Sequence, residues 1–207
     1  MLDYTLLSLF IPTFFLVSIT PGMCMTLAMT LGMTIGVKKT LWMMLGEVMG
    51  VGLVALLAGS GVSTIMLAYP AAFTLFKVLG ATYLLYIGVN MFCSKGKMAI
   101  ELNPTSKPFL SRSKLFNQGF MTAVTNPKGW AFMVSLLPPF INPELTLSTQ
   151  LVALISIILL SEFICMLLYA AGGRTLGKLL NKGDNVKTLN KISGGLMMLV
   201  AIWLVLS

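Results

Sequence analysis

Two proline-containing motifs interrupt long apolar stretches at positions that could bind an anion. Thr20-Pro21-Gly22 breaks one stretch, and Asn126-Pro127 breaks another. A proline inside a helix removes a hydrogen bond and clashes with the preceding turn, at about 3 kcal/mol. Threonine and asparagine favour the N-cap, and proline favours the first helical position. Each motif therefore predicts the start of a second half-helix, with free N–H groups and about +0.5 charge.

Two half-helix starts that face one cavity would form a carboxylate-binding site. Thr20, Pro21, Gly22, Asn126 and Pro127 are the predicted binding residues. The alternative for each motif is an ordinary proline kink, which membrane helices tolerate. The occurrence of two matched motifs, each with a cap residue, favours the binding site.

Lys128 follows the second proline directly. A cation in the first turn of a helix opposes the helix dipole. An unpaired charge within an apolar span also costs about 3 kcal/mol. We therefore predict that Lys128 binds a substrate carboxylate or pairs with an acidic residue, and the alternative is a lysine that extends to the membrane interface.

Glu47 and Glu162 are the two acidic residues inside the apolar stretches. Intramembrane carboxylates often carry protons or bind cations. Both residues are therefore predicted to serve in proton coupling or ion pairing. The alternative is a structural ion pair with Lys128 or with a nearby loop lysine. For Glu47, which lies only a turn or two past Lys39, this alternative is equal, whereas for Glu162 the functional role is favoured.

Met23-Cys24-Met25 supplies soft ligands of the kind that Cu(I) prefers. Residues two apart on a helix do not face each other, and methionine commonly fills apolar gaps. The chain has no histidine, and its three cysteines form no CxxC pair. We therefore expect no metal site, no cofactor and no enzymatic activity, and keep a soft-metal exporter as the alternative function.

The elements that must position these residues are membrane helices. The chain is 57% hydrophobic and 10% charged, with a mean hydropathy of +0.93, whereas soluble domains carry about 25% charged residues. A lipid bilayer is thus the expected surrounding. The net charge of +8 is attributed to cytoplasmic loops rather than to nucleic-acid binding. No cleavable signal peptide is expected, because the first apolar run is too long and no basic residue precedes it.

The apolar pattern predicts an all-α membrane protein with six transmembrane helices, the first and fourth of them broken. The predicted spans are Leu6–Val37, Leu41–Tyr69, Ala71–Cys93, Leu115–Ile141, Leu147–Gly172 and Ile192–Leu206. Residues 1–207 would form a single transmembrane transporter domain.

Basic residues concentrate in three of the five predicted loops. Twelve of the 14 lie there: Lys38, Lys39, Lys95, Lys97, Lys107, Arg112, Lys114, Arg174, Lys178, Lys182, Lys187 and Lys191. Because basic loops stay in the cytoplasm, the odd-numbered loops are predicted to be cytoplasmic and both termini periplasmic.

The two halves of the chain carry similar motifs in the same order. VSITPGM, LGEVMG and KVLGATYLL in the first half correspond to AVTNPKG, LSEFIC and KISGGLMML in the second. Each half has three spans, so the halves must insert in opposite orientations, as in many secondary transporters. The prediction is two inverted three-helix repeats, about 1–94 and 115–207, with a cytoplasmic linker of about 95–114.

Over essentially its full length the sequence resembles the LysE/RhtB family of bacterial amino-acid exporters. The resemblance rests on TPG (20–22), LGATYLLYIG (79–88), FNQGFMTAVTNPKGWAFMVSLLPPFI (116–141) and GGR (172–174) followed by NKISGGLMMLVAIWL. It implies a multi-pass inner-membrane carrier that exports amino acids or close derivatives, driven by the proton gradient. The substrate's identity and a homo-oligomeric state stay open.

The sequence departs from the family pattern at two positions. Met23 stands where the family has the last proline of Pro-Gly-Pro. Val51 stands where many members have an aspartate, and Glu47 lies one turn before it. Whether Glu47 replaces that aspartate is open.

Overall fold

The computed structural model describes residues 2–68, 70–93, 111–142, 144–180 and 183–206. Over these residues the chain is helical, without strands. The helices are α1 (Tyr4–Ile19), α2 (Met23–Ile35), α3 (Val37–Ala68), α4 (Pro70–Phe92), α5 (Arg112–Val124), α6 (Pro127–Leu136), the short 3-10 helix η1 (Pro138–Phe140), α7 (Leu147–Leu180) and α8 (Gly183–Leu206).

Both predicted helix breaks are present. Helices α1 and α2 meet at an angle of 58° across Thr20-Pro21-Gly22. Helices α5 and α6 are separated by Thr125 and Asn126. In both breaks the residue before proline has an extended backbone, with ψ of 131° at Thr20 and 105° at Asn126, because the proline ring disfavours the helical conformation there.

Helices α3 and α7 each have a segment long and apolar enough to cross a membrane, Val37–Gly61 and Leu147–Gly173. The bent pair α1 and α2 qualifies as a third span if it is counted as one. Together these segments indicate a multi-pass membrane protein. The prediction of six spans in two inverted repeats stays a prediction, and residues 94–110 of the predicted linker lie outside the described residues.

The last two helices are longer than the sequence pattern predicts. Helix α7 continues to Leu180, and α8 begins at Gly183 rather than near Ile192. The added turns are polar and basic, so hydropathy marks them as a loop. Lysine and arginine are nevertheless good helix formers, and these turns extend the two helices beyond their apolar segments.

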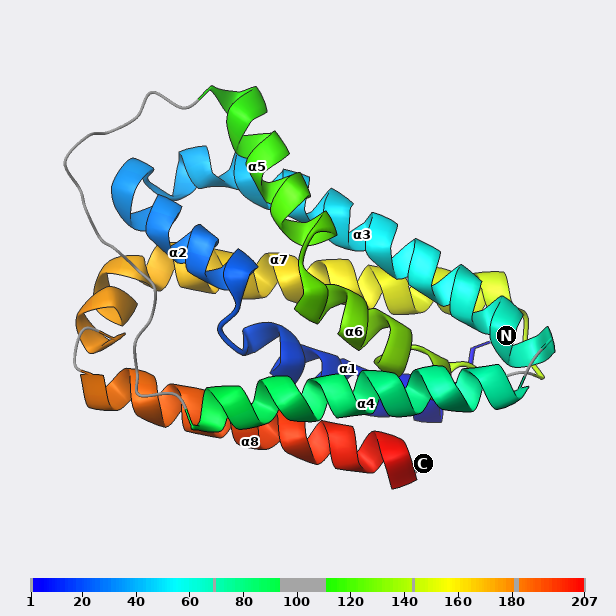
Figure 1. Cartoon of the computed structure of the whole chain (residues 1–207). Helices are drawn as coiled ribbons and strands as arrows, with labels where there is room; N and C mark the ends of the chain where they lie inside the picture. The colour runs from blue at the N-terminus through cyan, green and yellow to red at the C-terminus, as the bar shows by residue number, and fades with distance from the viewer. Residues whose placement is uncertain (1, 69, 94–110, 143, 181–182, 207) are drawn as a thin grey trace.

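The basic residues of three helix starts lie at one end of the molecule. The starts of α3, α5 and α8 lie at the end shown on the left in Figure 1, and carry Lys38 and Lys39, Arg112 and Lys114, and Lys187, respectively. The start of α1 and the end of α8 lie at the opposite end (Figure 1). These three helix starts therefore share one end of the molecule (Figure 1). That this end faces the cytoplasm stays a prediction.

Helices α3 and α5 are in backbone contact through glycine. A Cβ atom added to Gly46 would overlap the carbonyl oxygen of Phe116, and one added to Gly119 would overlap that of Met43. At Gly50 an added Cβ would lie 2.7 Å from the Cβ of Ala123. Glycine is thus required along this contact by the closeness of the two backbones.

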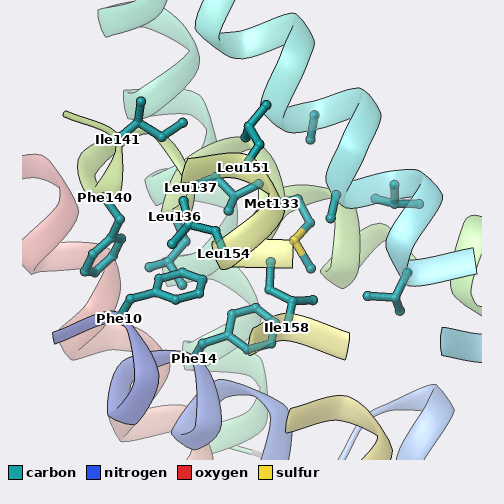
Figure 2. Close-up of a cluster of buried hydrophobic side chains, with 14 of the residues drawn as sticks. Phe10, Phe14, Met133, Leu136, Leu137, Phe140, Ile141, Leu151, Leu154 and Ile158 are labelled. Atoms are coloured by element: carbon teal, nitrogen blue, oxygen red, sulfur yellow. The ribbon is translucent and has the colours of Figure 1, made fainter. Parts of the chain in front are cut away.

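Two large clusters of buried apolar side chains fill most of the interior, and a smaller third cluster contains Val17, Phe132, Met197 and Ala201. One, shown in Figure 2, joins α1, α3, α6, η1 and α7 through residues that include Phe10, Phe14, Phe140, Leu154 and Ile158. The ring centroids of Phe10 and Phe140 lie 5.0 Å apart, with one ring edge on the other.

The second cluster joins α2, the first turns of α3, the start of α5 and the second half of α7, and includes Met29, Met43, Leu115 and Met166. The first helix break falls between the two clusters in sequence, whereas the second is flanked by Ala123 and Met133 of the first cluster. Residues of both clusters border the site described next.

Candidate functional site

A cavity of about 50 Å³ lies between the two apolar clusters. Six of the eight residues predicted from the sequence line it: Thr20, Gly22, Glu47, Asn126, Lys128 and Glu162. Pro21 and Pro127 are not among its lining residues, and they act by setting the breaks.

Asn126 caps helix α6, as predicted. Its Oδ1 accepts a hydrogen bond from the backbone N–H of Lys128 at 3.1 Å, and Pro127 occupies the first turn. Its Nδ2 donates to the Sγ of Cys24 at 3.7 Å, across to the start of α2. This one amide therefore fixes the start of α6 and joins it to the other broken helix.

The prediction that Thr20 caps the second half-helix is wrong. Thr20 is instead the C-cap residue of α1, and its hydroxyl donates to the carbonyl oxygen of Val17 at 2.6 Å. Helix α2 begins later, at Met23, with Gly22 as an N-cap residue that has no side chain to accept a hydrogen bond. The reason is the Pro-Gly pair: Gly22 is also extended, so α2 starts only after it.

Lys128 connects the two breaks. Its Nζ donates to the Oγ1 of Thr20 at 2.6 Å and lies 3.4 Å from the Thr20 carbonyl oxygen. A Cβ at Gly22 would lie 3.5 Å from the same Nζ. The ammonium group therefore points into the protein towards the break of α1 and α2. This position does not fit a lysine that extends to the membrane interface.

Glu162 enters the cavity from α7 and accepts a hydrogen bond from Ser18 of α1. The distance from the Ser18 Oγ to the Glu162 Oε1 is 2.9 Å. Farther along α7, the hydroxyl of Tyr169 donates to the carbonyl oxygen of Ile19 at 2.9 Å. Helix α7 thus holds the end of α1 at two points.

Glu47 enters from α3, and its side chain is 1% exposed. Neither of its carboxylate oxygens has a hydrogen-bond partner among the described residues. The alternative of an ion pair with Lys39 is therefore not realised in this structure. An acceptor without a donor in a buried, polar layer is a position where a ligand can supply the donor.

The three sulfur residues after the first break do not converge on a metal. Cys24 and Met25 line the cavity, whereas Met23 is 51% exposed. Among the described residues no group of three or more His, Cys, Asp or Glu side chains could hold a metal ion. This arrangement does not favour the soft-metal alternative.

Two residues that support the site were not predicted from the sequence: Ser18, which lines the cavity, and Tyr169, which holds the end of α1. Ser18 is a polar residue in an apolar stretch, two positions before the break. Tyr169 lies two helical turns after Glu162, which places both on one face of α7. The polar residue close to the break could have indicated Ser18, and the helical spacing from Glu162 could have indicated Tyr169.

The Asn126 cap gives a first test of the site. We expect Asn126→Ala to lower the free energy of unfolding by about 1 kcal/mol, as the loss of a cap usually does. We also expect weaker substrate binding, because the Lys128 backbone loses its anchor. Thermal unfolding and substrate titration of the purified protein would measure both effects.

Asn126→Asp is the matched control, because aspartate keeps the capping oxygen. It should retain the stability of the parent protein. Equal destabilisation by aspartate and alanine would contradict a capping role.

Comparison with known proteins agrees with these observations. The sequence model of the LysE type translocator family matches residues 15–207. The homoserine/homoserine lactone efflux protein of Salmonella typhimurium is 29% identical over 185 residues, covering 89% of this chain and 88% of that protein.

Two further relatives are similar over shorter segments. The uncharacterized membrane protein YrhP of Bacillus subtilis is 30% identical over 157 residues, 73% of this chain and 75% of that protein. The leucine efflux protein of Salmonella choleraesuis is 35% identical over 101 residues, 47% of this chain and 45% of that protein. No solved structure matches significantly. The match to nearly the whole chain and the agreement of the relatives lead to one conclusion: this protein belongs to the LysE type translocator family.

Proposed function

We propose that this protein exports amino acids or close derivatives from the cytoplasm in exchange for protons. The main support is the grouping of Lys128, Glu47 and Glu162 in one cavity at the meeting point of two broken helices. The names of the relatives, which include homoserine and leucine efflux proteins, support the same class of substrate.

In this proposal the substrate carboxylate binds to the Nζ of Lys128 and to the starts of α2 and α6. A helix N-terminus favours negative charge, and Lys128 lies where both starts meet. The substrate ammonium group then faces the carboxylates of Glu47 and Glu162. A proton binds to this acidic pair when the substrate has left.

The proposal includes two inverted three-helix repeats, with α1 to α4 in one and α5 to α8 in the other. Both broken helices then reach the middle of the membrane from opposite sides, as in other secondary transporters. The basic helix starts would face the cytoplasm, and both termini would face the periplasm. Accessibility of single cysteines at each terminus to a membrane-impermeant reagent would test this orientation.

Transport into everted membrane vesicles tests the function. We expect vesicles that contain the protein to accumulate labelled homoserine or leucine when a proton gradient is applied, and to lose the accumulation when a protonophore is added. A screen over all amino acids would identify the preferred substrate. If the correctly inserted protein moves none of them, the proposal fails.

A further inference from the structure

The two acidic residues of the cavity differ in what surrounds them. Glu162 already accepts a hydrogen bond from Ser18. Glu47 is 1% exposed, and neither of its oxygens has a hydrogen-bond partner among the described residues. Both residues line the same cavity, so a ligand there can reach either one.

An ionised carboxylate that no strong donor faces is unfavourable in a buried position, because it has lost its hydrogen bonds to water. A protonated carboxyl group avoids this penalty, since it is neutral. A substrate ammonium group, which has three N–H donors, would also remove the penalty. Glu47 therefore suits two alternative partners, a proton and an ammonium group.

The charged and titratable groups around Glu47 favour its binding a proton or an ammonium group in turn. Glu162 faces it from α7, the thiol of Cys24, a weak donor, interacts with it from α2, and Lys128 shares the cavity from α6. From α5, Gly119 lies against the backbone of Glu47, whereas the basic Arg112 and Lys114 lie in the first turn of that helix. The ammonium group of Lys128 is bound to Thr20, so it does not neutralise Glu47. The negative charge of Glu162 repels a second negative charge on Glu47, which favours a proton or an ammonium group there.

We propose that Glu47 is the residue at which the proton and the substrate ammonium group exchange, whereas Glu162 is an acceptor held by Ser18. This inference rests on the proposed function. When the substrate binds from the cytoplasm, its ammonium group replaces the proton of Glu47, which passes to the cytoplasmic solution. When the substrate leaves on the other side, Glu47 takes up a proton from there. One proton thus enters for each substrate exported.

Proton release on substrate binding provides the test. The full-length protein would be titrated with homoserine and with leucine by calorimetry, in two buffers of different ionisation enthalpy. The parent protein should release about one proton for each substrate bound near neutral pH, because binding is linked to loss of that proton. Glu47→Gln should release none while still binding. Glu162→Gln, the matched control, should bind more weakly but release the proton as before.

Infrared difference spectra decide the case if Glu47→Gln does not bind or fold. In the parent protein a band from a protonated carboxyl group should disappear when substrate is added. The same substrate-induced loss of the band should be seen in Glu162→Gln. In Glu47→Asp the band that is lost should lie at a different frequency.

The results separate this inference from the proposed function. If the parent protein binds no amino acid, the proposed function fails. If the parent binds but releases no proton, or if Glu47→Gln releases protons like the parent, the assignment of Glu47 is wrong. A carboxyl band that is absent in Glu162→Gln and unshifted in Glu47→Asp would also contradict that assignment.

Discussion

Replacing Lys128 by alanine is expected to reduce export by about 30-fold or more, because truncating one partner of a buried charge pair costs about 2–5 kcal/mol. The ammonium group joins the start of α6 to the break between α1 and α2 through Thr20. In the proposed complex it also provides the cation for the substrate carboxylate. The rate of homoserine or leucine uptake by everted vesicles would measure the loss.

Two variants control for effects unrelated to the site. Lys39→Ala removes an exposed cation at the start of α3 and should leave transport unchanged. Lys128→Arg keeps the charge and should retain part of the activity. Normal export by Lys128→Ala, with the protein present in the membrane at the parent level, would contradict the placement of the binding site.

Replacing Gly119 by alanine is expected to give the second large effect. The added Cβ would overlap the carbonyl oxygen of Met43, a backbone atom that a side-chain movement cannot displace. Helices α3 and α5 must then separate, and overpacking of this kind costs about 1–3 kcal/mol. In a chain of this size, each kcal/mol lowers the melting temperature by about 2–4 °C.

The same substitution should also reduce transport. The added Cβ would lie 2.9 Å from the backbone nitrogen of Glu47, so the movement of α3 displaces an acidic residue of the cavity. Thermal unfolding in detergent and vesicle transport would measure the two effects.

Gly61→Ala is the matched control, because an added Cβ there meets no atom within 4 Å. It should leave stability unchanged or raise it slightly, since alanine favours the helix by about 0.5–1 kcal/mol. Equal stability of the two variants would contradict the importance of the contact between α3 and α5.

The local chemistry of the breaks could largely be predicted from the sequence. Asn126-Pro127 starts a helix as expected, because the cap and the proline act within one turn. Thr20-Pro21-Gly22 predicts the break correctly, but it does not show that Thr20 ends the first helix rather than starting the second. A glycine after the proline allows further extended residues, and the sequence does not say where the next helix begins.

The partners of the site residues could not be predicted in the same way, because they belong to other helices. Glu47 and Glu162 look alike in their sequence surroundings, yet Ser18 donates to one of them only. That difference depends on how α1, α3 and α7 pack. The added turns of α7 and α8 could not be predicted for another reason. Hydropathy identifies the apolar segment of a helix, and it does not show where a helix with polar end turns begins or ends.

The two helix starts in the cavity are chemically unequal. Helix α6 has the side chain of Asn126 as its cap, whereas α2 begins at Gly22 without one. A substrate carboxylate at the start of α2 would accept the N–H hydrogen bonds that a serine or aspartate side chain accepts in an ordinary helix. The substrate would then serve as a removable N-cap, and the first turn of α2 would be most stable while the substrate is bound.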